Sequence, residues 1–345
     1  MRFGIVGTGM IAEFHAKAIS ELPGCSVVAC MDSIAERSDL FSRKYGCAGY
    51  SDLGKFLAHP GMDIVTICTP SGAHMETAVA AAEAGKHLIV EKPIEVTLDR
   101  IDAIIEACDK KGVSLTGVFM SRYGEAARIL KKAVDGGRFG RLVMGGAHIK
   151  WWRSQEYYDK GVWKGTKRFD GGGALINQGI HAIDLLQWYM GPVDSVFAYG
   201  AMLAHERIEV EDTAVAAIRF KSGALGIVEG STAAYPGFPK RIEISGSAGS
   251  ATLEEDTLPA WSFAEERSED ADIRNRFPAA IGVGGAADPA AIGYEGHKRQ
   301  FADVVKALGA GEKTLVDGRE ARKAVELILA FYRSAETGRE VKLPL

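Results

Sequence analysis

Residues 2–32 read RFGIVGTGMIAEFHAKAISELPGCSVVACMD, and this stretch decides the fold of the first third of the chain. An apolar run ends at Gly7, the sequence Gly7-Thr8-Gly9-Met10-Ile11-Ala12 follows, and a helical pattern begins there. In such a G-x-G-x-x-A turn the first glycine permits a tight turn, and the second lets a pyrophosphate approach the backbone. The N–H groups at the helix start face that anion. The stretch therefore predicts a dinucleotide site built from Gly7, Thr8, Gly9, Met10 and Ile11.

Asp32 ends the second apolar run. Its distance from the turn is that of a carboxylate that binds the hydroxyls of the adenosine ribose. Such a carboxylate accepts hydrogen bonds from a free 2′-hydroxyl and repels a 2′-phosphate, which favours NAD over NADP. We expect Ser33 to contribute to the same site, and Arg37 to stack on the adenine or, less readily, to accommodate a phosphate. A glycine-rich turn with a surface aspartate is the competing interpretation.

The first 120 residues alternate short apolar runs with helical patterns. The helical pattern is clearest in the apolar residues from Leu98 to Cys108, with Thr97 as the expected N-cap of this helix and Gly112 as its stop. Buried strands that alternate with helices indicate a parallel, doubly wound α/β sheet. We therefore expect an NAD-binding Rossmann domain over residues 1–120. Its expected strands are 2–7, 26–32, 63–70, 87–93 and 113–120, and its expected helices are 10–21, 34–45, 72–85 and 97–111.

The pattern changes after residue 120. Successive strands without intervening helices pair antiparallel or in a mixed sheet, which is typical of an α+β fold. We expect helices at 122–135 and 173–190 and strands at 142–152, 195–204, 211–220, 224–233, 240–245 and 250–254. This α+β substrate and oligomerisation domain is expected over 121–294, with a loop or lid at 265–293. The remaining residues, 295–345, are expected to form C-terminal helices, at 295–309 and 317–336, that pack back on the Rossmann domain.

The composition argues against several classes of protein. The formal net charge is −4, which does not favour a nucleic-acid partner. No apolar run reaches the roughly 20 residues of a membrane-spanning helix. The chain enters a strand directly after Met1, so we expect no membrane association and no secretory signal. The five cysteines form no CxxC pair, so we expect no metal site and a cytoplasmic location.

Three motifs together resemble the glucose–fructose oxidoreductase and inositol dehydrogenase family, the Gfo/Idh/MocA oxidoreductases. They are GTGMIAEFH at 7–15, Glu91-Lys92-Pro93 at the end of the expected strand 87–93, and GGGALINQGIHAIDLL at 171–186; the closing stretch 317–338 also fits. The resemblance covers essentially the whole chain. It implies a second domain with an open, mostly antiparallel sheet that often makes oligomer contacts, here in a homodimer or homotetramer. It also implies hydride transfer between NAD and a secondary hydroxyl or ketone of a pyranose sugar, a sugar derivative or a cyclitol.

The resemblance also assigns roles to single residues. It implies that Lys92, beside the cofactor, and His181 are catalytic, and that Asn177 binds substrate. The family usually has Asp where this chain has Asn177, so His181 is expected to be a weaker base. Lys92 is therefore expected to take the larger part in proton transfer. Asp184 either orients His181 or caps a local hydrogen bond. A solvated lysine and a packed helix histidine are the competing interpretations. The other residues that the resemblance places at cofactor or substrate are Thr69, Pro70, His74, Glu91, Met120 and Arg122.

Residues 151–170 read WWRSQEYYDKGVWKGTKRFD and hold three of the five tryptophans. Aromatic faces stack on pyranose rings, and Arg or Lys binds carboxylate or phosphate groups. The segment therefore predicts a substrate-recognition wall, against the alternative of a packed connection with a charged rim. It is similar to family members that act on sugars, including UDP-linked 2-acetamido-2-deoxyglucuronate 3-dehydrogenases. The expected substrate contacts are Arg153, Tyr158, Trp163 and Arg168.

Two other functions stay open. Some members of the family cleave glycosides by oxidising C3 transiently and returning the hydride from a tightly bound NAD. A non-catalytic NAD-binding sensor is the other alternative, and the presence of both Lys92 and His181 argues against it.

Overall fold

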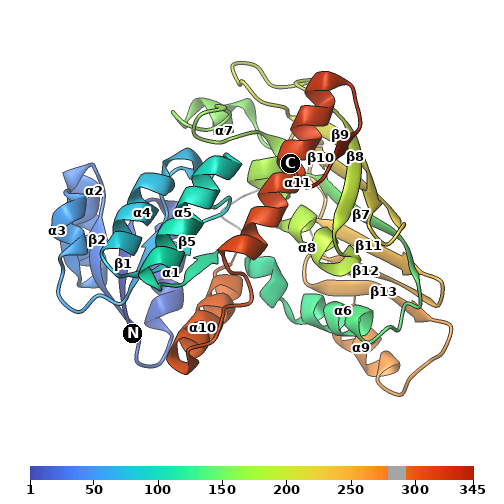
Figure 1. Ribbon diagram of the computed structural model, residues 1–345, viewed down its shortest axis with the longest axis horizontal. Helices are drawn as coiled ribbons and strands as arrows, with labels where there is room; N and C mark the ends of the chain where they lie inside the picture. Colours follow the sequence, from blue (N-terminus) through green and yellow to red (C-terminus); the bar gives the residue numbers. More distant parts are fainter. Residues whose placement is uncertain (279–292) are drawn as a thin grey trace. The chain divides into compact units, whose positions relative to one another are not determined.

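The computed structural model describes residues 1–278 and 293–345 (Figure 1). Residues 279–292 of the expected loop at 265–293 lie outside these ranges, and its described part contains a short helix, α9 (Asp270–Arg276). Two compact units make up the chain. Unit 1 comprises Met1–Met120, Arg168–Gly171 and Gly293–Arg322, and unit 2 comprises the described residues of Ser121–Lys167, Gly172–Ile292 and Lys323–Leu345.

Unit 1 is built on a six-stranded parallel sheet in the order β3-β2-β1-β4-β5-β6. The Rossmann-type sheet that the alternating pattern predicts is therefore present. The sequence did not predict β3, because Ala48-Gly49-Tyr50 is short and contains no apolar run. The strands are β1 (Arg2–Val6), β2 (Ser26–Met31), β3 (Ala48–Tyr50), β4 (Ile64–Ile67), β5 (His87–Val90) and β6 (Leu115–Gly117).

Helices connect the parallel strands, and α4 and α5 lie side by side against the sheet (Figure 1). The apolar stripe of α5 is buried at Ile101, Ile104 and Cys108, and Gly112 ends the helix in the left-handed region, as expected. The short helix α3 was not predicted. The helices of this unit are α1 (Met10–Ser20), α2 (Ala35–Tyr45), α3 (Leu53–Leu57), the 3-10 turn η1 (Ser71–Ala73), α4 (Met75–Glu83), α5 (Leu98–Lys111) and α10 (Glu295–Ala310).

The core of unit 1 includes a helix from near the end of the chain. Phe301 and Val304 of α10 lie in the same buried cluster as Phe3 and Ile5 of β1. The rings of Phe3 and Phe301 stack with their centres 6.4 Å apart. Residues from the two ends of the described chain therefore share one core.

Unit 2 contains an eight-stranded sheet in the order β13-β12-β11-β7-β10-β9-β8-β14. Only the pair of β7 with β10 is parallel among its described strands, so the sheet is mostly antiparallel, as expected. The sequence did not predict β13, which contains a proline, or the two-residue β14. The strands are β7 (Leu142–Lys150), β8 (Val193–Ala201), β9 (Thr213–Phe220), β10 (Leu225–Ser231), β11 (Arg241–Gly246), β12 (Gly249–Glu254), β13 (Thr257–Phe263) and β14 (Val341–Lys342).

The helix expected at 173–190 is two elements in the structure. Its first six residues form a π-helical turn, η3 (Ala174–Gly179), and α8 (Ile180–Met190) follows directly. A short helix, α7 (Gln155–Asp159), also interrupts the aromatic segment. The remaining elements are the 3-10 turn η2 (Met120–Tyr123), α6 (Glu125–Asp135) and α11 (Gly318–Thr337). None of the helices in the described ranges combines the length and apolar character needed to cross a bilayer.

The last helix belongs to both units, whereas the sequence pattern placed both C-terminal helices on the Rossmann domain. Ala321 of α11 packs beside Gly117 of β6. Further along α11, the Tyr332 hydroxyl donates to Glu211, and the Ser334 hydroxyl accepts from the Ala198 N–H. Glu211 and Ala198 are residues of unit 2. The helix is grouped accordingly, with residues 318–322 in unit 1 and 323–337 in unit 2.

Candidate active site

The turn between β1 and α1 has the geometry of a dinucleotide-binding loop. Gly7 has a φ of 83°, and its N–H donates to the Met31 carbonyl at 2.8 Å. A Cβ at Gly7 would lie 2.9 Å from the Cys68 backbone, so no other L-residue fits there without a shift. Gly9 is the N-cap of α1, and no described atom lies within 4 Å of the place of its Cβ. The helix start is therefore accessible to an anion.

Asp32 follows β2 and lies against this turn. Its carboxylate accepts from the Thr8 N–H at 3.0 Å, the Thr8 hydroxyl at 2.9 Å and the Ile34 N–H at 3.0 Å. A carboxylate offers about four acceptor positions, so these three bonds leave one for a ribose hydroxyl. Ser33 and Arg37 are both exposed in the segment that follows.

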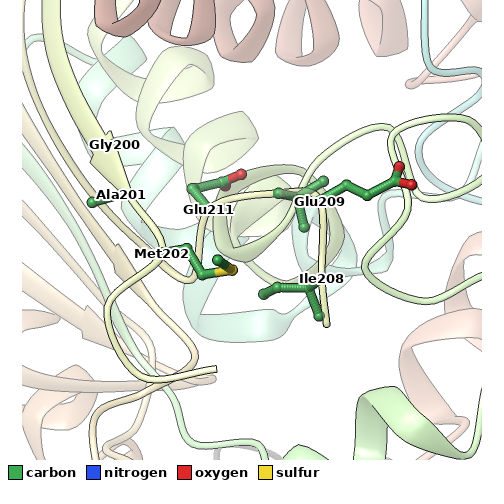
Figure 2. A pocket seen from close by; sticks show the side chains of 7 residues that line it. Gly200, Ala201, Met202, Ile208, Glu209 and Glu211 are labelled. Carbon is green, nitrogen blue, oxygen red and sulfur yellow. The ribbon is translucent and has the colours of Figure 1, made fainter. Parts of the chain in front are cut away.

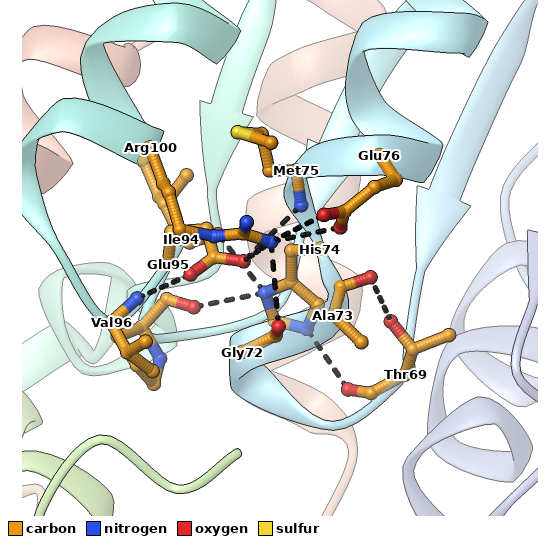
Figure 3. A network of polar contacts seen from close by, with 11 residues as sticks. Thr69, Gly72, Ala73, His74, Met75, Glu76, Ile94, Glu95, Val96 and Arg100 are labelled. Atoms are coloured by element: carbon orange, nitrogen blue, oxygen red, sulfur yellow. Dashed lines mark hydrogen bonds and ion pairs between the residues drawn. The ribbon is translucent and has the colours of Figure 1, made fainter. Parts of the chain in front are cut away.

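His74 connects the turns that follow β4 and β5. The side chain is 1% exposed, and its Nε2 lies 2.9 Å from the Thr69 carbonyl oxygen (Figure 3). Its Nδ1 lies 3.0 Å from the carbonyl oxygens of both Pro93 and Ile94. Since both ring nitrogens contact the backbone, the structure gives His74 a supporting position behind the turns. The sequence had suggested that it lines the cofactor or substrate.

Glu95 strengthens the same connection, and the sequence gave no signal for it. It is completely buried, and it accepts from Arg100 at 3.0 Å and from the Val96 N–H at 2.7 Å. Arg100 also donates to Glu76 of α4 (Figure 3). These contacts fix the segment just after Lys92-Pro93 to the start of α4.

Glu91 lies at the end of β5, buried between two histidines that the sequence analysis did not single out. His15 Nε2 is 2.8 Å and His297 Nε2 is 3.5 Å from Glu91 Oε1, while Oε2 accepts the Lys92 N–H at 3.0 Å. Burial alone would raise the pKa of Glu91, but the hydrogen bonds from both histidines outweigh it and hold that pKa well below its usual range. Burial lowers the pKa of His15. Near neutral pH, Glu91 is therefore ionised and His15 is neutral.

The same three side chains place their ligand atoms within 4.8 Å of one another, an arrangement that can also hold a metal ion. The separation of 2.8 Å between His15 and Glu91 is that of a hydrogen bond. The other ring nitrogen of His15 lies 2.7 Å from the Thr66 hydroxyl. We interpret the group as a hydrogen-bond network that joins α1, β5 and α10. Its only local signal in the sequence is a histidine on the buried face of α1, beside Ala12 and Ala16.

In unit 2, Asn177 lies in η3 and His181 in the first turn of α8, both partly buried. Gln178 donates to Asn177 Oδ1 at 3.1 Å and accepts from Arg153 Nη2 at 3.1 Å. Arg153 is 2% exposed and also donates to the Trp152 carbonyl at 2.8 Å. Arg153 therefore supports Asn177 through Gln178, a residue that the sequence analysis missed. The sequence had suggested direct contact between Arg153 and substrate.

Arg122 is also buried, in a bidentate pair with Asp184. Its Nε and Nη2 donate to the two carboxylate oxygens at 2.8 and 2.7 Å, and its guanidinium lies over the Trp188 ring. Such a pair fixes both side chains in one geometry. Arg122 therefore packs against α8 as the partner of Asp184, whereas the resemblance had placed it at the cofactor or substrate.

The aromatic segment divides into packed and accessible residues. Tyr158 is 6% exposed, donates to the Thr232 hydroxyl at 2.9 Å and packs with Ile208 and Val210. These contacts are those of a packed connection. Trp163 is partly buried and Arg168 is exposed, and Arg168 is grouped with unit 1. Accessible surface for a ligand therefore remains at Trp163 and Arg168.

The expected cofactor residues of unit 1 follow strands that lie beside one another. Gly7, Asp32, Thr69 and Lys92 come after β1, β2, β4 and β5, whose carboxyl ends meet at one edge of the sheet. Met120 packs beside Gly296 of α10. The other expected residues of this unit lie at the same turns: Thr8, Met10, Ile11, Ser33, Pro70 and Glu91.

Comparison with known protein families matches both units. Residues 1–119 match the GFO_IDH_MocA family, described as an oxidoreductase family with an NAD-binding Rossmann fold. Residues 127–252 match the GFO/IDH/MocA C-terminal domain.

Two individual relatives are similar over nearly the whole chain, and a third over about three quarters of it. The structure of the WlbA dehydrogenase from Bordetella pertussis in complex with NADH and UDP-GlcNAcA is 36% identical, with a TM-score of 0.91, and covers 100% of this chain and 98% of that one. Myo-inositol 2-dehydrogenase of Thermotoga maritima is 29% identical over 99% of this chain and 98% of that protein. The scyllo-inositol 2-dehydrogenase (NAD(+)) of Bacillus subtilis is 30% identical over 72% of each.

The contacts of Glu91 predict how stability depends on pH. A carboxyl group whose pKa is lower in the folded chain stabilises the fold above its unfolded pKa, and this contribution is lost as the pH falls through the folded pKa. We expect Glu91→Gln to reduce the free energy of unfolding by about 1.5–3 kcal/mol at pH 7, since hydrogen bonds to a charged group are lost. The difference should persist to about pH 5 and shrink below about pH 4.

Urea unfolding of the wild type and variant across this pH range measures the effect. Glu83→Gln, on the exposed side of α4, is the matched control and should leave the free energy of unfolding unchanged. Equal stability of wild type and Glu91→Gln at pH 7 would contradict the assignment.

Proposed function

This chain belongs to the GFO/IDH/MocA oxidoreductase family, and from that membership we propose that it is an NAD-dependent dehydrogenase of a sugar derivative. In the proposed reaction, a secondary hydroxyl of the sugar becomes a ketone, and the reverse reaction reduces the ketone. The observation that carries the proposal is the set of turns after β1, β2, β4 and β5, which combines a dinucleotide loop with Lys92 at one sheet edge.

The residues of the glycine-rich turn fit NAD. The accessible N–H groups at the start of α1, beside Gly9, suit the pyrophosphate, and the remaining acceptor position of Asp32 suits a ribose hydroxyl. When bound, NAD supplies the acceptor for the hydride that leaves the substrate carbon. Thr69, Pro70 and Met120 are proposed to line the same site.

Oxidation of an alcohol also requires that the hydroxyl proton leave. We assign this proton to Lys92 and His181, with Asn177 holding the substrate rather than ionising. Glu91 holds the backbone of Lys92 through the Lys92 N–H, and His74 holds the carbonyl oxygens of the two residues that follow. Lys92 therefore extends from a segment that is fixed on both sides, which is what a group acting at one atom of a substrate requires.

For the substrate, we propose a nucleotide-linked sugar acid first. The dehydrogenase from Bordetella pertussis, whose structure contains UDP-GlcNAcA, is 36% identical over the whole chain. Accessible Trp163 and Arg168 offer a ring face and a guanidinium, which suit a pyranose and an anionic group. A free cyclitol is the second candidate, because the myo-inositol 2-dehydrogenase of Thermotoga maritima is also similar over nearly the whole chain.

We further propose that the outer face of the unit 2 sheet joins subunits into a homodimer or homotetramer. Exposed apolar side chains lie together on this face, since paired residues of neighbouring strands share a side of the sheet. Leu225 pairs with Met144, and Tyr199 pairs with Val215. Clustered apolar surface of this kind marks an interaction site. Its exposed members are Met144, Tyr199, Val215, Leu225 and Ile227.

The first prediction concerns turnover. We expect the protein to form NADH with UDP-linked 2-acetamido-2-deoxyglucuronate, and Lys92→Ala to reduce kcat by about 10²–10⁴-fold, while NAD still binds. Lys111→Ala, an exposed lysine on α5, is the control. A panel that includes myo-inositol, scyllo-inositol, free sugars and glycosides identifies the substrate class by NADH absorbance. Glycoside cleavage without net NADH supports the glycoside-cleaving alternative, and NAD binding without turnover supports the sensor.

The second prediction concerns cofactor choice. Asp32→Ala should weaken NAD binding by about tenfold or more, since a charge-assisted hydrogen bond contributes about 1.5–3 kcal/mol, and it should improve NADP binding because a repelling charge is gone. Calorimetric titration with both nucleotides measures the change. Asp39→Ala, exposed on α2, should have no effect. Wild-type protein that binds NADP at least as well as NAD would refute the role of Asp32.

The third prediction concerns assembly. Ile227→Lys places a charge in the exposed apolar face, so we expect a smaller particle in sedimentation velocity than for the wild type. Leu40→Lys changes an even more exposed apolar residue, on α2, and should leave the particle size unchanged. A monomeric wild type would exclude this interface.

A further inference from the structure

Glu211 accounts for three successive backbone N–H groups at the start of η3, the π-helical turn that carries Asn177. Its carboxylate accepts from the Gly173 N–H at 2.9 Å and from the Leu175 N–H at 2.9 Å, and its backbone carbonyl accepts from the Ala174 N–H at 3.1 Å. Helix starts leave such groups without partners inside the helix. One residue from the loop before β9 therefore satisfies three of the N–H groups at the start of η3.

Tyr332 of α11 completes this contact, because its hydroxyl donates to Glu211 Oε1 at 2.9 Å. The glycines that precede η3 make the approach possible. A Cβ at Gly172 would lie 2.2 Å from the Tyr332 hydroxyl, and a Cβ at Gly173 would lie 1.8 Å from the Glu211 carbonyl oxygen. A side chain at Gly172 would therefore displace the Tyr332 ring, and a side chain at Gly173 would displace the Glu211 backbone.

We propose that Glu211 is a positioning residue for Asn177 and His181, and that its ionised form is the one that holds η3 in place. The inference rests on the proposed function of those two residues. Glu211 itself touches neither substrate nor cofactor in this proposal. It acts through the backbone of residues 173–175, from which η3 and then α8 continue without a break.

A cavity of about 250 Å³ lies beside Glu211, lined also by Met202, Ile208 and Glu209 (Figure 2). Burial raises the pKa of Glu211 above its ordinary value, although the hydrogen bonds from Leu175, Tyr332 and Gly173 oppose the rise. The cavity gives protons and water a route to a carboxylate that is otherwise mostly enclosed. Glu211 is therefore able to titrate in the folded chain.

Three titratable side chains in the described part of the chain lie near Glu211, and each has its own partners. Tyr332 faces it from α11, and burial together with Glu211 raises the pKa of this tyrosine well above 10, so it stays a donor. The Glu209 carboxylate points away in Figure 2 and accepts the Lys167 N–H at 2.8 Å. Asp212 accepts from the N–H groups of 203–205 and contacts His205. Among the described residues, Tyr332 is thus the titratable side chain that binds the Glu211 carboxylate.

Protonation of Glu211 has opposite effects on the helix start and on overall stability. A proton on one carboxylate oxygen removes an acceptor, so the hold on η3 weakens as the pH falls. The raised pKa means that the folded chain favours the protonated form, so the free energy of folding becomes more favourable over the same fall in pH. If Glu211 served only to stabilise the fold, its protonated form would serve better than its ionised form. The proposed positioning role, in contrast, requires the ionised carboxylate, which offers more acceptors to the backbone N–H groups.

Two substitutions test the proposal on the activity of the complete enzyme. Glu211→Gln cannot ionise and presents an NH₂ group to backbone donors. We expect it to lower kcat by about 10–100-fold, as for a small misplacement of reacting groups, to leave KM for NAD unchanged, and to abolish the acid limb of the pH–kcat profile assigned to Glu211. Tyr332→Phe removes a hydrogen bond that lowers the pKa of Glu211, so the acid limb should move to higher pH. Glu209→Gln, in the same cavity, should change neither property.

Hydrogen exchange provides a readout that does not need turnover. In Glu211→Gln, compared with the wild type at one pH, we expect faster exchange of the amides of residues 173–179, with Glu209→Gln unchanged. Unaltered exchange there, or an acid limb that stays in place in Tyr332→Phe, would overturn the positioning role. If the wild type turns over no substrate, the proposed function fails, and the exchange comparison still decides the role of Glu211.

Discussion

The parallel pairing of β1 with β2 on one side and with β4 on the other is the constraint on which unit 1 depends. All six strands run in the same direction, so their carboxyl ends meet at one edge, and the strand order reverses at β1. In open sheets of this kind, ligands bind where the order reverses. Gly7, Asp32, Thr69 and Lys92 reach that edge because of the pairing. The ligand that this edge of the sheet can bind depends on the side chains of these four residues.

Two buried carboxylates, Glu91 and Glu211, fix the backbone near the candidate site residues, and the balance between burial and hydrogen bonding shifts their pKa values in opposite directions. A buried charge costs several kcal/mol unless it is paired and hydrogen-bonded. The histidines beside Glu91 more than offset its burial, so its pKa falls and its charge stabilises the fold near neutral pH. The donors around Glu211 do not offset its burial, so its pKa rises. The first arrangement strengthens the Rossmann unit, whereas the second disfavours the charge that the proposed role of Glu211 requires.

Local sequence rules predicted most of the elements and the motif positions but not the contacts between them. The alternation of apolar runs and helices, the left-handed Gly112 and the turn at Gly7 depend on neighbours in sequence, so the pattern alone indicates them. The network of His15, Glu91 and His297 joins two helices to a strand and leaves no periodic trace. Arg153 was expected at the substrate because arginine binds anions, and Arg122 because the family resemblance places it at the cofactor or substrate. Their burial depends on Asp184 and Gln178, partners that only the folded chain identifies.

The same contacts give a physical meaning to Asn177, where the family usually has an aspartate. Arg153 has only donors, so it must bind the oxygen of Gln178, and the Gln178 NH₂ group then donates to Asn177 Oδ1 at 3.1 Å. This fixed order leaves the Asn177 NH₂ group as its donating end. An aspartate at this position would offer an acceptor and a charge instead. A donor suits the oxygen of a hydroxyl or a ketone equally, which is consistent with the proposal that Asn177 binds the substrate without taking part in proton transfer.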